Sequence, residues 1–328
     1  MMCLGIESTA HTFGVGIVSD EGKILANVTD SYKPTKGFGM KPIDAAKHHE
    51  RVKEDILERA LKEAGLTIDD IDVISFSQGP GLPPCLRVGK DFAIGLARKH
   101  RKPIVPVNHC IAHIEIGRLF SEAKDPVTLF VSGGNTQILS YVEGRYRCFG
   151  ETMDISIGNA LDKLGRELGL EFPGGPKIEQ LAREGRYIEL PYVVKGMDLS
   201  FSGLVTEAVK RFGQGEKIED VCFSFQETAF AMLTEVTERA LAHVRKNEVV
   251  LTGGVAANKR FSDMLGTMCR ERDASLYACP IELSGDNGAM IAWLGILMHK
   301  SVRKSKKSTD DMDIEPRQRT DELEVTWL

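Results

Sequence analysis

The segment NHCIAH, residues 108–113, places two histidines four positions apart. If this segment is helical, His109 and His113 lie one above the other on the same helix face. Two imidazoles in this arrangement can bind one metal ion. The same spacing is also found for two ordinary packed or exposed histidines, so the pair by itself leaves both interpretations open.

A metal site needs at least one further ligand, and a carboxylate commonly completes a pair of imidazoles. The best candidate is Asp286, in the segment ELSGDNGAMIAW at residues 282–293. We expect it in a turn between a strand, SLYACPIEL, and an apolar helix. An Asp in such a turn usually caps the following helix, and without knowledge of the fold this is the simpler interpretation.

The bulk composition is typical of a soluble globular protein. The chain has 328 residues, of which 42% are hydrophobic and 27% charged, and this length favours two domains. No apolar run approaches the roughly 18 residues of a membrane span, and the N-terminal residues do not resemble an export signal. The seven cysteines form no CxxC pair. We therefore expect a cytoplasmic protein with no membrane segment.

Two parts of the chain repeat one pattern. Residues 3–29 and 127–152 each read as an apolar strand, a polar turn, a second strand, a short turn and a third strand. Helical periodicity follows in both parts, at residues 44–65 and 156–170. The repetition predicts two related α/β domains with a cleft between them, and ligands of such sheets bind at the carboxyl ends of the strands.

Four predicted strands run into turns rich in Gly, Ser, Thr and Asn: GIESTAHT, FSQGPGLPP, FVSGGNTQ and VVLTGGVAANKRF. Such turns let backbone N–H groups approach a phosphate, and a following helix N-terminus adds partial positive charge. The pattern predicts a nucleotide-like ligand. The sequence contains neither GxxxxGK[ST] nor a GxGxxG that opens a helix after the first strand, which disfavours P-loop and dinucleotide-binding folds.

Several side chains near these turns have both a ligand-binding and a structural interpretation. Asn258, in a predicted helix start at residues 255–261, could bind a base or could simply accompany tight packing. Glu179 follows FPGGP, where a helix should begin near Pro176, and could bind ribose or only favour the helix dipole. Asp162, in GNALDKLG, could belong to the same site or to a solvated helix face.

Taken together, these motifs resemble the threonylcarbamoyl-adenosine transferases, a family of the actin-like ATPase superfamily once named O-sialoglycoprotein endopeptidases. The resemblance rests on LGIEST, GPGLPPCLRVG, VNHCIAH, VSGGNTQ, GNALDKLGR, FPGGP, KGMDLSFSGL, LTGGVAANKR and SGDNGAM, which together span nearly the whole chain. The closing EPRQRTDELEVTW is similar to the archaeal and eukaryotic branch, which works in the KEOPS complex. The implied fold is a duplicated actin-like fold with a central nucleotide cleft, divided as 1–122 with 295–328 and 123–294.

The resemblance also implies an activity. The threonylcarbamoyl group of L-threonylcarbamoyl-adenylate passes to the exocyclic amine of the adenine beside the anticodon, in tRNAs that read codons beginning with adenine, and AMP leaves. By the same resemblance one iron or zinc ion is held by His109, His113 and Asp286. The adenylate donor, or another adenine nucleotide, is contacted by Phe130, Val131, Ser132, Gly133, Gly134, Asp162, Gly175, Glu179 and Asn258.

One position departs from the family pattern. Where several archaeal relatives have a metal-binding tyrosine, this chain has Phe130, which offers no ligand atom. No general base is assigned. The expected partners are tRNA and, in the KEOPS complex, a small atypical kinase, a dimerising subunit and a regulatory subunit.

The net charge of −5 does not indicate nucleic-acid binding, but RKHRK at 98–102 with Lys33, Lys36 and Lys41 could contact tRNA phosphates.

A metalloprotease is disfavoured because Cys110 and Ala112 stand between the histidines and no HExxH is present. A small-molecule kinase or a chaperone-like ATPase would have this fold without needing the histidine pair. An adenine-nucleotide-binding, metal-containing scaffold without catalysis is the alternative of a different class.

Overall fold

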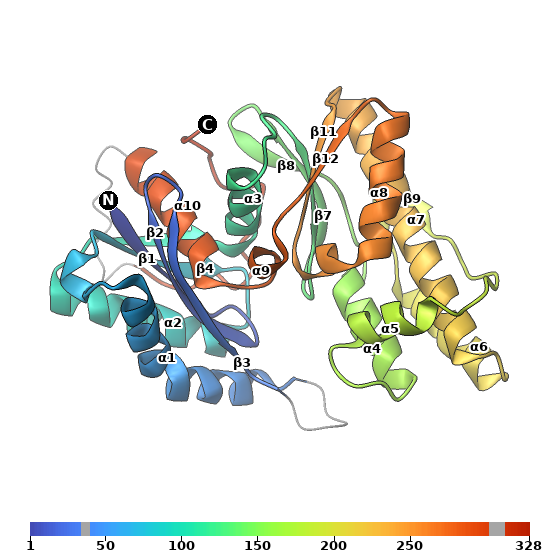
Figure 1. Cartoon of the computed structure of the whole chain (residues 1–328), viewed down its shortest axis with the longest axis horizontal. Coiled ribbons are helices and arrows are strands. Elements are labelled where there is room, and N and C mark those ends of the chain that lie inside the picture. The colour runs from blue at the N-terminus through green and yellow to red at the C-terminus, as the bar shows by residue number, and fades with distance from the viewer. Residues whose placement is uncertain (34–39, 302–311) are drawn as a thin grey trace. The chain divides into compact units, whose positions relative to one another are not determined.

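The computed structural model describes residues 1–33, 40–301 and 312–328 (Figure 1). The chain divides into two compact units, described separately below. Unit 1 comprises residues 1–119, 143–145 and 286–328, and unit 2 comprises residues 120–142 and 146–285. Among the described helices, none combines the length and the apolar character that a membrane span requires. All seven cysteines are free thiols.

Unit 1 is built on a five-stranded sheet in the order β3-β2-β1-β4-β5. Strand β2 is antiparallel to both β1 and β3, whereas β4 pairs in parallel with both β1 and β5. The elements of this unit are β1 (Met2–Glu7), β2 (Thr12–Ser19), β3 (Ile24–Ser31), α1 (Pro42–Ala64), η1 (Ile68–Asp70), β4 (Val73–Gly79), α2 (Pro83–His100), β5 (Ile104–Asn108), α3 (His109–Leu119) and α10 (Gly288–Ser301).

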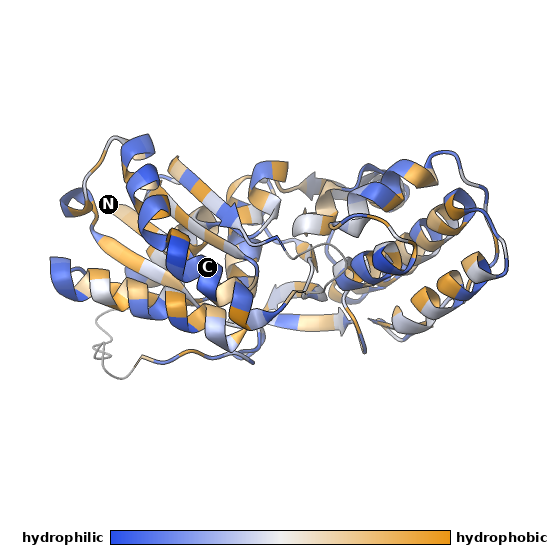
Figure 2. Cartoon of the chain, turned by 90° about the horizontal axis from the view of Figure 1, so that it is seen from below, coloured by the Kyte–Doolittle hydropathy of each residue, from blue (hydrophilic) through white to orange (hydrophobic). Residues whose placement is uncertain are grey.

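The two faces of this sheet carry side chains of different size. Leu4, Ile6 and Val15 are fully buried among the apolar side chains that pack with Ile56 and Ala60 of α1, and α2 also lies on this side (Figure 1). Figure 2 shows that these outer helices combine hydrophobic and hydrophilic residues along their length, as expected for helices with one buried face.

The opposite face has small residues where α10 crosses it, and α10 lies directly on the sheet backbone there. An added Cβ at Gly5 would stand 2.2 Å from the backbone nitrogen of Ala292, and one at Gly16 would stand 2.1 Å from that of Ala289. Ser75 donates its hydroxyl hydrogen to the carbonyl of Ile291 at 2.9 Å. Side chains alternate along a strand, so small residues at every second position allow this close contact.

Unit 2 repeats the topology of unit 1 with the sheet order β12-β11-β6-β7-β8. Strand β7 is antiparallel to β6, and β11 pairs in parallel with β6 and β12. Its elements are β6 (Val127–Val131), β7 (Thr136–Val142), β8 (Arg145–Glu151), α4 (Ile157–Glu167), α5 (Gly174–Ala182), β9 (Val194–Lys195), β10 (Asp198–Leu199), α6 (Ser202–Gly213), α7 (Ile218–Val244), β11 (Glu248–Thr252), η2 (Gly254–Ala257), α8 (Lys259–Glu271), β12 (Ser275–Ala278) and α9 (Ile281–Ser284).

The predicted duplication is confirmed, because the two sheets have matching strand orders, and in each an antiparallel strand pair is followed by two strands that pair in parallel. The units differ from the expected domain bounds in three places. Residues 286–294 belong to unit 1 with the rest of α10, residues 143–145 also belong to unit 1, and residues 120–122 belong to unit 2. The predicted first residue of the helix at 255–261 is wrong. Residues 254–257 form a short 3₁₀ helix, and α8 begins at Lys259 with Asn258 as its N-cap.

The C-terminal segment of the chain packs on unit 1. The backbone N–H of Glu315 donates to the carbonyl of Gln78 at 2.8 Å, and Asn108 Nδ2 donates to the carbonyl of Arg319 at 3.3 Å. Trp327 Nε1 donates to Glu115 Oε1 at 2.8 Å. These bonds connect the segment to the ends of β4 and β5 and to helix α3.

We predict that Gly16→Ala destabilises the protein by roughly 3 kcal/mol, because the new methyl group would meet backbone atoms that no side-chain rotation can move. The matched control is Gly95→Ala, on the exposed side of α2, where an added Cβ meets nothing within 4 Å. The control should stabilise by about 0.5–1 kcal/mol. Denaturant unfolding of the two variants measures the difference, and equal stabilities would contradict the close contact of α10 with the sheet.

Candidate functional site

Helix α3 starts directly after β5, and its first residue is His109. The Asn108 side chain caps this start, since its Oδ1 accepts a hydrogen bond from the backbone N–H of Ile111 at 3.0 Å. The predicted helix is therefore confirmed for the histidine pair, with His109 and His113 in successive turns. Their ring centroids are 4.8 Å apart and nearly perpendicular.

Asp286 lies between α9 and α10. The prediction that it directly follows a strand is wrong, because β12 ends at Ala278 and Pro280, which has no N–H for strand pairing, precedes the short helix α9. Capping of α10 is performed by the next residue, Asn287, whose Oδ1 accepts the backbone N–H of Met290 at 3.0 Å. The Asp286 carboxylate is therefore available for other contacts.

The three predicted metal ligands are brought together in unit 1. Asp286 Oδ1 lies 3.2 Å from His113 Nε2 and 3.5 Å from His109 Nε2. Among the residues that the structure describes, these three form a group whose ligand atoms all lie within 4.8 Å of one another. Two imidazole nitrogens and a carboxylate oxygen form a donor set typical of zinc and of non-haem iron, so the residues present fit a divalent transition metal.

Glu7, at the carboxyl end of β1, belongs to this site but was not predicted. Its side chain is 0% exposed, and its Oε2 lies 3.0 Å from His109 Nδ1. Its Oε1 accepts hydrogen bonds from both the backbone N–H and the hydroxyl of Thr9. The sequence signal was an acidic residue at the end of a strongly apolar strand, which suggests a buried carboxylate with a specific partner.

These contacts determine the charge state of the site. Burial opposes protonation of His109, but attraction from Glu7, the hydrogen bond that His109 donates to Glu7 and attraction from Asp286 raise its pKa to about 9. Burial lowers the pKa of His113, and the hydrogen bond to Asp286 offsets this only in part. Although burial raises the pKa of Asp286, the hydrogen bond from His113 and the charge of His109 hold it well below its usual range. The arrangement thus favours an ionised Asp286 beside a neutral His113.

The Gly-rich turn after β6 lies in unit 2, together with the other residues predicted to contact the donor. Phe130 and Val131 are fully buried in β6, while Gly133 and Gly134 are exposed and an added Cβ at either would meet nothing within 4 Å. The Ser132 hydroxyl accepts the backbone N–H of Asn135 at 3.0 Å. The two glycines therefore present open backbone to an incoming group.

Three of the remaining predicted residues, all in unit 2, make hydrogen bonds at helix starts. Asp162 Oδ1 accepts the backbone N–H of Gly174 at 2.8 Å, at the start of α5. Glu179 Oε1 accepts the backbone N–H of Lys259 at 3.0 Å, at the start of α8. Next to it, Asn258 caps α8 and donates to Gln226 Oε1 at 3.0 Å.

Each of these three side chains bonds at a helix start. This role differs from the solvated helix face, the helix dipole and the tight packing that the sequence suggested as structural interpretations. Their roles in binding a donor stay predictions. A carboxylate has about four acceptor positions and an amide has two donors and two lone pairs, so these side chains keep the capacity for ligand bonds. Gly175 lies beside them, and an added Cβ there would touch only Leu161, at 3.7 Å.

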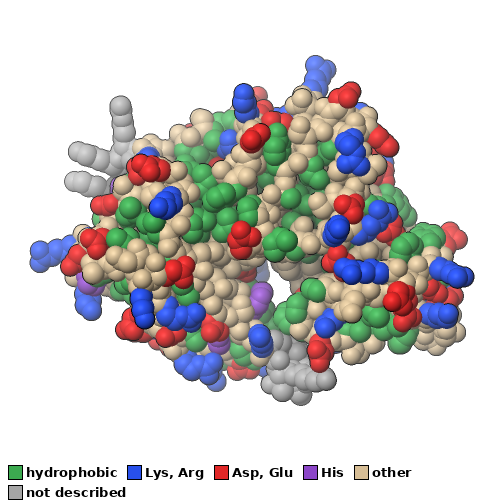
Figure 3. All heavy atoms as spheres, viewed as in Figure 1, with side chains coloured by type: hydrophobic (Ala, Val, Ile, Leu, Met, Phe, Trp, Pro, Cys, Tyr) green, Lys and Arg blue, Asp and Glu red, His purple; other side chains and the backbone are tan. Residues whose placement is uncertain are grey.

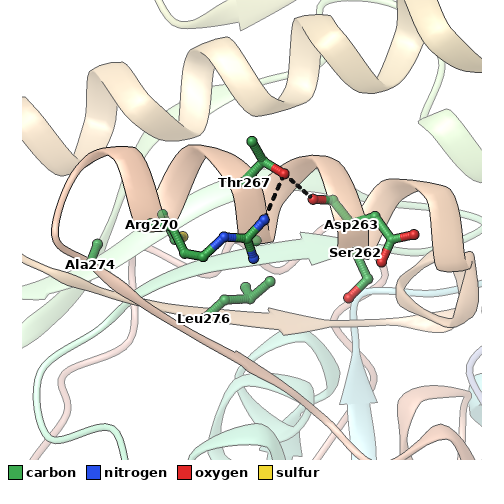
Figure 4. A pocket seen from close by; sticks show the side chains of 8 residues that line it. Ser262, Asp263, Thr267, Arg270, Ala274 and Leu276 are labelled. Atoms are coloured by element: carbon green, nitrogen blue, oxygen red, sulfur yellow. Dashed lines mark hydrogen bonds between the residues drawn. The ribbon is translucent and has the colours of Figure 1, made fainter.

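A surface pocket of about 470 Å³ lies between α8 and β12 (Figure 4). Its polar groups are engaged with one another, since Arg270 Nη2 donates to the Thr267 hydroxyl, which donates to the carbonyl of Asp263, both at 3.0 Å. None of the predicted site residues lines this pocket. We therefore assign this pocket no role in the function.

The predicted basic cluster lies at the end of α2. His100 pairs with Asp69 at 3.7 Å and Lys102 donates to the carbonyl of Asp69, while Lys99 and Arg101 are exposed. Lys33 and Lys41 are exposed as well, and Lys36 lies outside the described residues. On the face drawn in Figure 3, Lys and Arg side chains are interspersed with Asp and Glu.

Solved structures with similar folds have little sequence similarity to this chain. HypF from T. kodakarensis superimposes with a TM-score of 0.63 at 14% identity, covering 91% of this chain and 48% of that protein. Component A of (R)-2-hydroxyglutaryl-CoA dehydratase from Acidaminococcus fermentans gives 0.57 at 12% identity, covering 92% and 99%. These similarities support the predicted duplicated actin-like fold.

Relatives with high sequence identity cover the whole chain. A protein of Thermococcus gammatolerans named tRNA N6-adenosine threonylcarbamoyltransferase is 57% identical over 100% of both chains, and one of the same name from Methanopyrus kandleri is 53% identical over 100% of this chain and 96% of that protein. A probable bifunctional tRNA threonylcarbamoyladenosine biosynthesis protein of Methanocaldococcus jannaschii is 54% identical, and the match covers 61% of its length. The profile of the tRNA N6-adenosine threonylcarbamoyltransferase family matches residues 23–293. This chain therefore belongs to the tRNA N6-adenosine threonylcarbamoyltransferase family.

Proposed function

We propose that this protein transfers the threonylcarbamoyl group from L-threonylcarbamoyl-adenylate to the exocyclic amine of the adenine next to the tRNA anticodon, with release of AMP. Membership of the family supports the reaction class. The observation that carries the proposal is the convergence of His109, His113 and Asp286, which are far apart in sequence and yet place their ligand atoms within 4.8 Å of one another.

The three residues would hold one divalent metal ion, iron or zinc, in a buried setting. When bound, such an ion supplies Lewis-acid polarisation of a carbonyl or phosphate oxygen, as is useful in acyl transfer. With Asp286 and the two histidines as its protein ligands, such an ion would keep at least one position for water or substrate. The two histidines are buried and Asp286 is partly exposed, and low exposure strengthens the electrostatic interactions at the site.

The residues of unit 2 would hold the adenylate donor. Gly133 and Gly134 offer open backbone for the phosphate or acyl part, next to the start of α4, where Ser156 caps the helix. Helix starts carry partial positive charge and attract anions. Asp162, Glu179 and Asn258, with Gly175, would contact ribose and base. The aromatic amine of adenine is a weak nucleophile, so its positioning would account for much of the rate enhancement.

We further propose that the protein works in the cytoplasm and assembles with a small atypical kinase, a dimerising subunit and a regulatory subunit, as in the KEOPS complex. The family resemblance of the C-terminal EPRQRTDELEVTW segment supports this assignment. The same segment is held on unit 1 through the bonds of Glu315 and Trp327.

For the proposed function, the first prediction concerns metal and activity together. The purified wild-type chain should contain about one equivalent of iron or zinc, and the His109→Ala/His113→Ala double variant should contain none, because it lacks two of the three ligands. In a reaction of the chain and its partner subunits with the adenylate donor and unmodified tRNA, only the wild type should form N6-threonylcarbamoyladenosine. Elemental analysis and mass spectrometry of digested tRNA measure the two outcomes.

A folded wild type that binds metal and adenine nucleotide, but forms no modified adenosine in the reconstituted reaction, would contradict catalysis and support the scaffold alternative. His243→Ala is a suitable control, since this histidine packs against Phe149 in unit 2. It should leave the metal content unchanged.

The second prediction concerns the donor site. Gly133→Ala should leave the free energy of unfolding nearly unchanged, because the added methyl group meets no protein atom. It should weaken binding of a hydrolysis-resistant analogue of the adenylate at least tenfold, about 1.4 kcal/mol, by occupying the space where a phosphate would approach. Calorimetric titration measures the affinity. Gly203→Ala, equally open but in α6, is the control, and unchanged affinity in both variants would remove Gly133 from the site.

The third prediction concerns tRNA. Replacing Lys99 and Arg101 by Gln should weaken tRNA binding and reduce the slope of log affinity against log salt by roughly 0.7–0.9 for each phosphate that the protein no longer neutralises. The control replaces Lys210 and Arg211, which pair with Glu207 on α6, by Gln. Filter binding at several salt concentrations provides the slopes. An unchanged slope in the Lys99/Arg101 variant would refute this assignment.

A further inference from the structure

Glu7 places a carboxylate in the interior of unit 1. A buried charge is costly unless it is paired and hydrogen-bonded. Glu7 is fully satisfied, since Oε1 accepts two hydrogen bonds from Thr9, one of them from the backbone at 2.6 Å, and Oε2 faces His109 Nδ1 at 3.0 Å. The Thr9 bonds fix the orientation of the carboxylate, and so they fix the position of Oε2.

This geometry specifies which nitrogen of His109 carries the hydrogen. An ionised carboxylate can only accept, so Nδ1 must donate to Glu7. In the neutral imidazole, the lone pair is then on Nε2. Nε2 is the atom that lies 3.5 Å from Asp286 Oδ1, on the side where His113 Nε2 also lies.

We propose that Glu7 is a positioning residue of the metal site: it holds the Nδ1 hydrogen of His109 and thereby keeps Nε2 directed at the ion. The inference rests on the proposed metal site and adds a residue to it. A carboxylate behind a metal-binding histidine orients the ring and increases its basicity. Glu7 has a second effect, because its charge and that of Asp286 together balance a divalent cation bound with two neutral imidazoles, so the buried site carries no net charge.

Thr9 extends the arrangement by one residue. Its side chain is 3% exposed, and its hydroxyl lies 3.4 Å from His109 Nδ1 as well as bonding to Glu7. Thr9→Val would keep the backbone bond to Glu7 and remove the hydroxyl. We therefore expect the same kind of effect as for Glu7, but smaller.

The test is titration of metal-free protein with Co²⁺, followed by visible absorption, for the wild type and Glu7→Gln. The amide keeps the shape of the side chain and removes its charge. We expect the Co²⁺ affinity to fall 10–100-fold, the range measured when such supporting partners are replaced, with a smaller fall for Thr9→Val. Equal affinities in wild type and Glu7→Gln would overturn the inference, while an absence of Co²⁺ binding in the wild type would overturn the metal site itself.

Glu115→Gln is the matched control. Glu115 is also buried and lies two residues after His113, but its carboxylate bonds to Arg118 and Trp327. Positions two residues apart on a helix point in widely different directions. This variant should bind Co²⁺ like the wild type, and an equal loss in both variants would show a general effect of removing a buried charge and contradict the specific role of Glu7.

A spectroscopic measurement tests the proposal without any substitution. In Zn²⁺-loaded wild type labelled with ¹⁵N-histidine, long-range ¹H–¹⁵N correlation reports which ring nitrogen carries hydrogen. His109 should show hydrogen on Nδ1 and metal on Nε2. Hydrogen on Nε2 would overturn the proposal even if Glu7→Gln failed to fold.

Discussion

The arrangement of unit 1 depends on the contact between the backbone of α10 and the backbones of β1 and β2. This contact is possible only because Gly5, Gly16 and Gly288 lack side chains where the helix crosses the sheet. Close-packed backbone cannot adjust as flexible side chains do, so the start of α10 has one position relative to the sheet. Asp286 precedes that start by two residues, and it is therefore placed against α3, which follows another strand of the same sheet.

The site is also constrained by the division of roles between neighbouring residues. A helix start needs a capping acceptor, and in both helices an Asn adjacent to the predicted ligand provides it: Asn108 before His109, and Asn287 after Asp286. If Asp286 capped α10 itself, one of its oxygens would be committed to backbone N–H groups. Instead, its Oδ1 faces both histidines. At this turn Asn287 caps the helix, and Asp286 contacts the two histidines.

The sequence predicted the duplicated α/β fold, both Gly-rich turns of unit 2 and the helical histidine pair, because period-2 and period-3.6 patterns are local properties. It could not show from residues alone that Asp286 meets that pair, since this contact joins positions 173 residues apart; the family resemblance provided that expectation. Two predicted element bounds were wrong because of neighbouring residues. Pro280 prevents the strand from reaching Leu283, and the 3₁₀ helix at residues 254–257 moves the start of α8 to Lys259. Glu7 was missed because a strand pattern does not reveal what a buried acid contacts.

The glycines around the turn after β6 fall into two groups, those that pack against other backbone and those that face open space. Gly158 and Gly253 are packing residues, because an added Cβ would stand 2.4 Å from the Ser132 carbonyl oxygen and 2.3 Å from that of Val131. Both therefore make close contact with the backbone that leads into the Gly-rich turn. Gly133 and Gly134 are at the same turn but face open space. A glycine without a steric reason in the folded chain costs backbone entropy, and the proposed close approach of the donor to this backbone would account for its presence there.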